Sequence, residues 1–194
     1  EVEKNIRAAV EIARSAADGK NVWIAGDIGP IPVNGTEDAA AAADEYYQIA
    51  KTFAECGVTV LDFETFADLD GILPAIKKIR AEYDMFIAVS FSVNQFGYSA
   101  AGLSAKRLLA DAAAVPEIDA VGLNCGVGPA HMRQILEKVG RPGDKFLLAI
   151  PNAGYPTLTR NKLQFGNTPA YFAEKMKELQ ALGADILGGC CGTT

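Results

Sequence analysis

Short apolar runs recur along the chain, and each is followed by polar or glycine-containing residues and then by a stretch with helical periodicity. The runs are rich in Val, Ile, Leu and Phe without strict alternation, which is typical of strands buried on both faces. We therefore expect six strands, over Val22–Ala25, Val58–Phe63, Met85–Phe91, Ile118–Leu123, Phe146–Ile150 and Ala184–Leu187. The intervening stretches predict helices over Glu3–Ala17, Glu37–Glu55, Leu69–Glu82, Ser104–Ala114, Ala130–Val139 and Pro169–Leu182.

The spacing of these elements indicates the fold class. Strand starts recur every 27 to 38 residues, which is the rhythm of βα units in a parallel sheet. The glycine-rich turn of a dinucleotide-binding fold is incomplete, because Gly126 and Gly128 have no third glycine after them. An α/β fold of the (β/α)₈ TIM-barrel type fits better, at about 250 residues for eight units. We expect residues 1–194 to form a single, truncated barrel domain that lacks its first two strands and last helix.

Composition narrows the classes of function. The chain has 194 residues and a net charge of −6, which disfavours binding to nucleic acid or to an anionic membrane. A single histidine, His131, excludes sites that need two imidazoles. Four cysteines without marks of secretion indicate a reducing compartment, so we expect a cytoplasmic protein with metal or redox chemistry at its thiols.

Residues whose side chains can bind a metal ion or a substrate lie where the predicted strands end. These residues are Asp27, Glu64, Ser90, Ser92, Asn124, Cys125, Asn152, Cys190 and Cys191. In a barrel all strand ends face one mouth, where active sites are built, so residues far apart in sequence converge there.

Three of the cysteines give the sharpest signal. Cys125 ends one strand, and Cys190 and Cys191 end a later one. Three thiolates with one open position suit a catalytic zinc ion, which prefers soft tetrahedral ligands. Neighbouring residues on a strand face opposite ways, so both of the paired cysteines can reach one ion only if the glycines around them permit a sharp turn. Buried free thiols and a strained disulfide between the two neighbours remain the alternatives.

Five segments together resemble the zinc-dependent homocysteine S-methyltransferase family, and most closely the homocysteine-binding barrel of bacterial cobalamin-dependent methionine synthases. They are Ala25–Pro30, Phe63–Thr65, Gly122–Cys125, Pro151–Gly154 and Gly188–Thr193. The resemblance covers nearly the whole chain, from about Val22 to Thr194.

The resemblance implies a role for each site residue. Cys125, Cys190 and Cys191 would be the catalytic zinc ligands, and Glu64 would bind the amino group of homocysteine. Asn152 would line the zinc pocket, and Asp27 would help to shape the substrate pocket. The family's first strand carries an Asp-Gly turn that holds the substrate carboxylate, and no such segment exists here. The substrate site is therefore expected to be incomplete and the fragment inactive alone.

The implied reaction is zinc-dependent methyl transfer to the thiol of homocysteine, which gives methionine. The donor in the nearest relatives is methylcobalamin on a separate domain, served by a folate-binding domain, whereas other members use betaine or S-methylmethionine. Three alternatives stay open. They are a methyltransferase for another thiol or selenol, a structural-zinc or thiol-regulatory domain without chemistry, and a metal-free barrel in which Asp27 and Glu64 act as an acid/base pair on a sugar.

Overall fold

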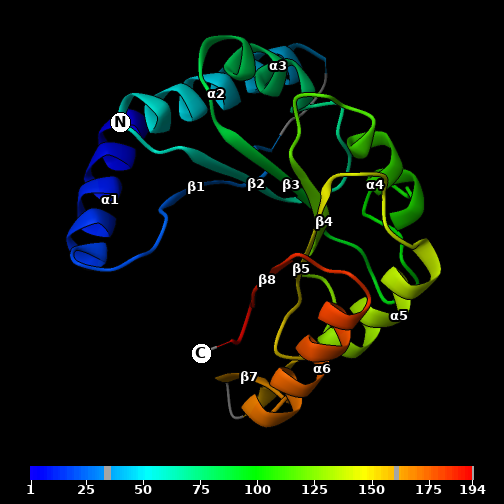
Figure 1. The fold of residues 1–194 in the computed structure, drawn as a ribbon. Helices are drawn as coiled ribbons and strands as arrows, with labels where there is room; N and C mark the ends of the chain where they lie inside the picture. Colours follow the sequence, from blue (N-terminus) through cyan, green and yellow to red (C-terminus); the bar gives the residue numbers. More distant parts are fainter. Residues whose placement is uncertain (33–35, 160–161, 194) are drawn as a thin grey trace.

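The computed structural model describes residues 1–32, 36–159 and 162–193. Six parallel strands form one curved sheet in the order β1-β2-β3-β4-β5-β8, so the strands lie side by side in their sequence order. They are β1 (Ala25–Ile28), β2 (Val60–Phe66), β3 (Phe86–Phe91), β4 (Ala120–Asn124), β5 (Phe146–Ile150) and β8 (Ile186–Leu187). The prediction of a parallel α/β fold is thereby confirmed, and the six strands form a half-barrel (Figure 1).

Helices precede and connect the strands and cover the convex side of the sheet (Figure 1). They are α1 (Val2–Ala17), α2 (Thr36–Glu55), α3 (Leu73–Glu82), α4 (Ala105–Ala113), α5 (Pro129–Val139) and α6 (Pro169–Ala181). Ser104 and Thr168 cap α4 and α6, because each side chain accepts a hydrogen bond from a backbone N–H in the first turn. Local capping therefore fixes where these helices begin.

The main core lies between the sheet and the helices. Leu61 and Phe63 of β2, which alternate with polar neighbours, are fully buried in it. The opposite, concave face carries a smaller apolar cluster of Ala88, Ala120 and Leu148. This division leaves the concave face with room for polar residues on β1 and β2.

Several element bounds shift by a few residues, as for β8, which spans Ile186–Leu187 rather than Ala184–Leu187, and two differences are larger. The first strand lies at Ala25–Ile28 rather than Val22–Ala25, and Val22 and Trp23 before it are exposed. Its register is set by pairing Ala25 with Val60, which places the apolar Ile28 in the core. Tertiary pairing thus overrides the apolar run on which the prediction was based.

The second difference is an antiparallel hairpin that was not predicted. It consists of β6 (Pro156–Thr159) and β7 (Lys162–Phe165) and lies between β5 and α6. The segment is short and largely polar, so hydrophobic periodicity gives no signal for it. The hairpin begins at Pro156, six residues after the carboxyl end of β5 at Ile150.

The curved sheet has two edges in the residues that the structure describes. β1 and β8 are each paired on one side only, and Figure 1 shows them at opposite ends of the arc. Separately, no helix in the described ranges has the length and apolar character needed to cross a membrane.

Candidate metal centre

Cys125 is held in place by a tight backbone turn at the end of β4. Its φ is +54°, which is uncommon for a residue with a side chain, and Gly126 follows with a φ of +67°. A Cβ atom on Gly126 would lie 2.3 Å from the carbonyl oxygen of Val93, so only glycine fits there. The backbone N–H of Cys125 donates to the carbonyl of Ile150 on the neighbouring β5, at 3.0 Å. The turn and this bond fix the position of the cysteine.

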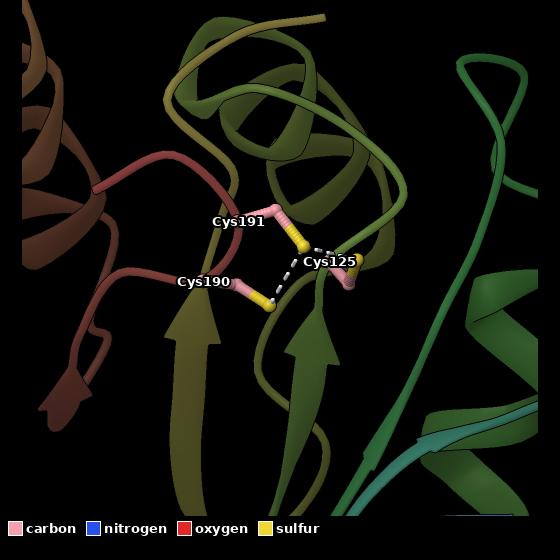
Figure 2. A group of neighbouring side chains, drawn as sticks. All are labelled: Cys125, Cys190 and Cys191. Carbon is pink, nitrogen blue, oxygen red and sulfur yellow. Dashed lines mark hydrogen bonds between the residues drawn. The ribbon is translucent and has the colours of Figure 1, made fainter. Parts of the chain in front are cut away.

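Cys190 and Cys191 lie in the loop after β8, where backbone contacts hold them against the end of β5. The N–H of Cys190 donates to the carbonyl of Pro151 at 2.9 Å. The N–H of Cys191 donates to Oδ1 of the buried Asn152 at 3.2 Å, and the carbonyl of Cys191 accepts from the N–H of Ala153 at 2.9 Å. Because both cysteines lie beyond the strand, they escape its alternation and direct their sulfurs to one side (Figure 2).

The three sulfurs form a compact cluster. The Sγ atom of Cys191 is 3.8 Å from that of Cys125 and 4.0 Å from that of Cys190, and all three sulfurs lie within 4.8 Å of one another (Figure 2). Tetrahedral zinc with Zn–S bonds of about 2.3 Å places its sulfurs about 3.8 Å apart. The donor atoms and their spacing therefore fit a zinc ion, and all three cysteines are free thiols.

The environment of the cluster disfavours free thiolates. Burial, followed by repulsion from Cys125, raises the pKa of the Cys190 thiol to about 12. Cys191 is exposed, so the cluster is open to solvent on one side. A dication would offset two of the three negative charges of the thiolates, and its binding would release the protons of the thiols.

Two cavities lie near residues that neighbour the cysteines in the sequence. One, of about 480 Å³, is lined by residues of the loops after β2 and β3 and reaches Gly126, the residue after Cys125. Another, of about 410 Å³, reaches Gly189 and Gly192 on either side of the cysteine pair. Each of the two chain segments that carry the cysteines therefore also contributes a glycine to the wall of a cavity.

Glu64 is linked to the metal centre through Asn124. Asn124 is fully buried, and its amide donates to Oε2 of Glu64 at 2.9 Å and accepts from the N–H of Thr65 at 2.8 Å. Burial and repulsion from Asp27 raise the pKa of Glu64, whereas the bond from Asn124 opposes that shift. Because Cys125 directly follows Asn124, this network ties the carboxylate on β2 to the strand end that carries the first sulfur.

Asp27 lies in β1, where it is the register partner of Asp62 on β2. Desolvation raises the pKa of Asp27, and desolvation together with repulsion from Glu64 and Asp27 raises the pKa of Asp62 to about 7. The sequence analysis missed Asp62, although a carboxylate inside an otherwise apolar strand was a visible signal. It also assigned no role to Asn124, whose importance depends on a contact across 60 residues of sequence.

Comparisons with known proteins identify the family of the chain. The family model described as "Homocysteine S-methyltransferase" matches residues 1–194. The methionine synthase of Mycobacterium tuberculosis (strain ATCC 25618 / H37Rv) is 28% identical over 197 residues, which cover 94% of this chain and only 16% of that protein.

Two solved structures share the fold. The apo form of the homocysteine methyltransferase MmuM from Escherichia coli has a TM-score of 0.77 at 21% identity, with 99% of this chain and 69% of that chain covered. The metallated form of the same enzyme has a TM-score of 0.77 at 20% identity, over 99% of this chain and 67% of that one. The match of the family model over the full sequence establishes that the chain belongs to the homocysteine S-methyltransferase family.

Proposed function

We propose that this chain binds zinc through Cys125, Cys190 and Cys191 and takes part in methyl transfer to the thiol of homocysteine, which yields methionine. The observation that supports the proposal is the cluster of three sulfurs from two separate strand ends, with spacings that suit one tetrahedral ion. Three protein ligands leave a fourth position for a substrate sulfur, as in catalytic zinc sites.

The chemistry of the step follows from the donor set. A zinc ion bound there would lower the pKa of the substrate thiol, so that its sulfur is present as a thiolate at neutral pH. That sulfur would use its own electron pair to form a bond to the methyl carbon. The bond between the methyl group and its donor would break, and both electrons of that bond would remain with the donor. Electron-rich thiolate ligands keep the substrate sulfur nucleophilic.

The other residues of the chain position the reactants. In this proposal Glu64 accepts hydrogen bonds from the amino group of homocysteine, and its link to Asn124 sets the direction of its carboxylate. Asn152 holds the backbone of Cys191 and lines the metal pocket. Asp27 lies on the same face of the sheet and shapes the pocket beyond Glu64.

The methyl donor in this proposal is methylcobalamin, bound by a separate cobalamin-binding domain and re-methylated with the help of a folate-binding domain. The similarity to methionine synthase supports this choice. Such a domain would approach the sulfur cluster from its exposed side, at Cys191.

Zinc content of the purified chain tests the proposal directly. We expect one zinc ion per chain, lost in Cys191→Ser and retained in Cys56→Ser, because Cys56 contacts Arg7 and lies outside the cluster. X-ray absorption at the zinc edge should show three sulfur neighbours, which rise to four when homocysteine is added. Four sulfurs before the addition would favour a structural metal site, and equal loss of zinc in both variants would contradict the assignment of ligands.

A further inference from the structure

The cavity of about 480 Å³ is lined by residues at the ends of β2, β3 and β4. Thr65 and Phe66 belong to the end of β2, and Ser92 directly follows β3. Gly126, the residue next to Cys125, completes the wall, and a Cβ atom on it would lie 2.9 Å from Oγ of Ser92. The chain segment that carries one of the three sulfurs therefore also forms part of this cavity.

Two residues at this cavity have a strained backbone. Thr65 has a φ of +67°, which is an outlier for a β-branched residue, and Cys125 has a φ of +54°. They are the two residues other than glycine with a positive φ in the part of the chain that the structure describes. Asn124 holds Thr65 there, because its Oδ1 accepts from the Thr65 N–H at 2.8 Å and its amide donates to Oγ1 at 2.7 Å. Strain of this kind persists only where the surrounding structure fixes it, and it concentrates at ligand-binding sites.

Another wall of the cavity is a hydrogen-bonded loop that displays aromatic side chains. Oδ1 of Asn94 accepts from the N–H groups of Phe96 and Tyr98, at 2.9 and 3.2 Å. The N–H of Asn94 in turn donates to the carbonyl of Tyr98 at 2.9 Å. Phe96 is 76% exposed and Tyr98 is 49% exposed, and Tyr98 lines the cavity. Rings that the backbone already holds in place bind a partner at a low cost in conformational entropy.

None of the described residues that line the cavity carries a charge. The polar groups of the wall are hydroxyls and the amide of Asn94, and because Oδ1 of that amide is occupied, its NH₂ group remains to donate to a ligand. Ser99 also lines the cavity, is 6% exposed, and its Oγ atom has no hydrogen-bond partner among the described residues. A charged ligand would lose water here without meeting an opposite charge. The cavity therefore suits an uncharged ligand that both donates and accepts hydrogen bonds.

This chemistry distinguishes between classes of methyl donor. Betaine combines a quaternary ammonium group with a carboxylate, and S-methylmethionine carries a sulfonium, an ammonium and a carboxylate group. A corrin ring instead presents uncharged primary carboxamides along its rim, and each of them donates through its NH₂ group and accepts through its oxygen. The uncharged wall therefore matches the carboxamides of a corrin and neither of the two charged donors.

We propose that this cavity binds a carboxamide-bearing edge of the methyl donor and so selects an uncharged donor. The inference rests on the proposed function and deepens it, because it names the surface of this chain that recognises the donor. The NH₂ group of Asn94 donates to a carboxamide oxygen, and the hydroxyls of Ser92 and Ser99 serve the carboxamide NH₂ groups. The ring of Tyr98 packs against the apolar part of the donor.

The test measures binding of dicyanocobinamide, a corrin whose rim carries carboxamides and which has no methyl group to transfer, to the zinc-free chain. Calorimetry should show binding to the wild type and about tenfold weaker binding to Tyr98→Ala. Tyr171→Ala is the matched control, because Tyr171 is a partly exposed tyrosine on α6 that does not line the cavity, and it should bind as the wild type does. Equal affinities of all three proteins, or equal weakening in both variants, would overturn the proposal.

A second pair of variants tests the uncharged character of the wall. Asn94→Asp keeps an acceptor for the N–H groups of Phe96 and Tyr98 but replaces the NH₂ donor with a negative charge, so cobinamide should bind about tenfold more weakly. Asn21→Asp adds the same charge at an exposed position between α1 and β1 and should leave the affinity unchanged. Tighter binding of betaine or S-methylmethionine than of cobinamide to the wild type would show that the cavity does not select an uncharged donor.

NMR spectra of the zinc-free chain separate this inference from the proposed function. Cobinamide should shift the backbone amide signals of Ser99 and Gly126 and leave the signal of Tyr171 unchanged. Such shifts in a chain that failed to bind zinc would support the cavity and count against the proposed function. Zinc binding without these shifts would leave the metal site in place and overturn the inference.

Discussion

Asp62 is a carboxylate that loses its contact with water on folding, whereas its neighbours in the strand gain stability from burial. Its neighbours Leu61 and Phe63 pack in the core, whereas its own carboxyl group is desolvated without a cation beside it. Burial of this kind favours the protonated form, and the nearby Glu64 and Asp27 add to the effect. The residue therefore links the stability of the fold to pH.

The first prediction concerns this link. The pKa of Asp62 is raised from 3.8 to about 7, so the folded protein keeps a proton that the unfolded chain releases between these values. The free energy of unfolding should fall as pH rises through that range, by about 1–2 kcal/mol after allowance for solvent screening. Urea unfolding at pH 5 and pH 8 measures the change. Asp62→Asn should remove most of it and Asp144→Asn, which removes an equal charge from an exposed loop, none. An unchanged slope in Asp62→Asn would contradict the assignment.

The second prediction concerns the turn that places Cys125. Gly126→Ala should destabilise the fold by about 2–4 kcal/mol, because the new Cβ meets the carbonyl of Val93 at a left-handed φ. Gly102→Ala is the matched control, with a φ of +75° and no atom within 4 Å of the new Cβ, and it should lose about 1 kcal/mol. Urea unfolding compares the two variants, and equal losses would show that the close contact has no effect.

Among the elements, β8 is the least anchored part of the site. It has two residues and two register pairs with β5, so the loop after it depends on contacts with Pro151, Asn152 and Ala153. The segment that supplies two of the three sulfurs is therefore positioned from the neighbouring strand.

The third prediction tests that dependence. Asn152→Ala removes the acceptor of the Cys191 N–H and should weaken zinc binding about tenfold, as is usual for residues that orient metal ligands. Asn152→Asp keeps an acceptor at the same place and should retain most of the affinity. Competition with a chelator gives the two affinities. Equal weakening in both variants would show that the acceptor is not what matters.

The elements themselves were largely predictable from the sequence. Phe146–Ile150 was predicted with the bounds that the structure shows, because an unbroken apolar run between turn residues has few other interpretations. The position of β1 was wrong, since its register depends on Val60 and not on its own composition. The hairpin of β6 and β7 gave no periodic signal and so could not be anticipated.

On the scale of the whole molecule, β1 forms one edge of the half-barrel among the residues that the structure describes. Trp23, the only tryptophan of the sequence, lies two residues before β1 and is 90% exposed. Its indole ring therefore reports on the environment of this edge.

The fourth prediction uses that property. Acrylamide should quench the fluorescence of Trp23 nearly as efficiently as that of free tryptophan, and unfolding in urea should change the emission wavelength little. A steady-state quenching titration on the dilute protein is sufficient. Strong protection of Trp23 in the folded state would show that another surface covers this edge.

The candidate site was only partly predictable. The three cysteines could be brought together from the sequence, because their positions after strands of one parallel sheet place them at one end of it. The arrangement of the carboxylates was harder to predict. The pairing of Asp62 with Asp27 depends on the register of the two strands. The contact of Asn124 with Glu64 depends on the direction of both side chains. Spacing along the chain carries neither kind of information.

The distance in sequence between Cys125 and Cys191 has a consequence for folding as well as for chemistry. These residues are 66 positions apart, and the segment between them contains α5, β5, the hairpin, α6 and β8. A metal ion that held both sulfurs would cross-link the chain and close that segment into a loop. If the ligands stayed bound in the unfolded chain, the lost conformational entropy would amount to about 4 kcal/mol at this loop length, as for a disulfide. The same cysteines would then determine both the reactivity of the metal site and how firmly β8 is held to the rest of the fold.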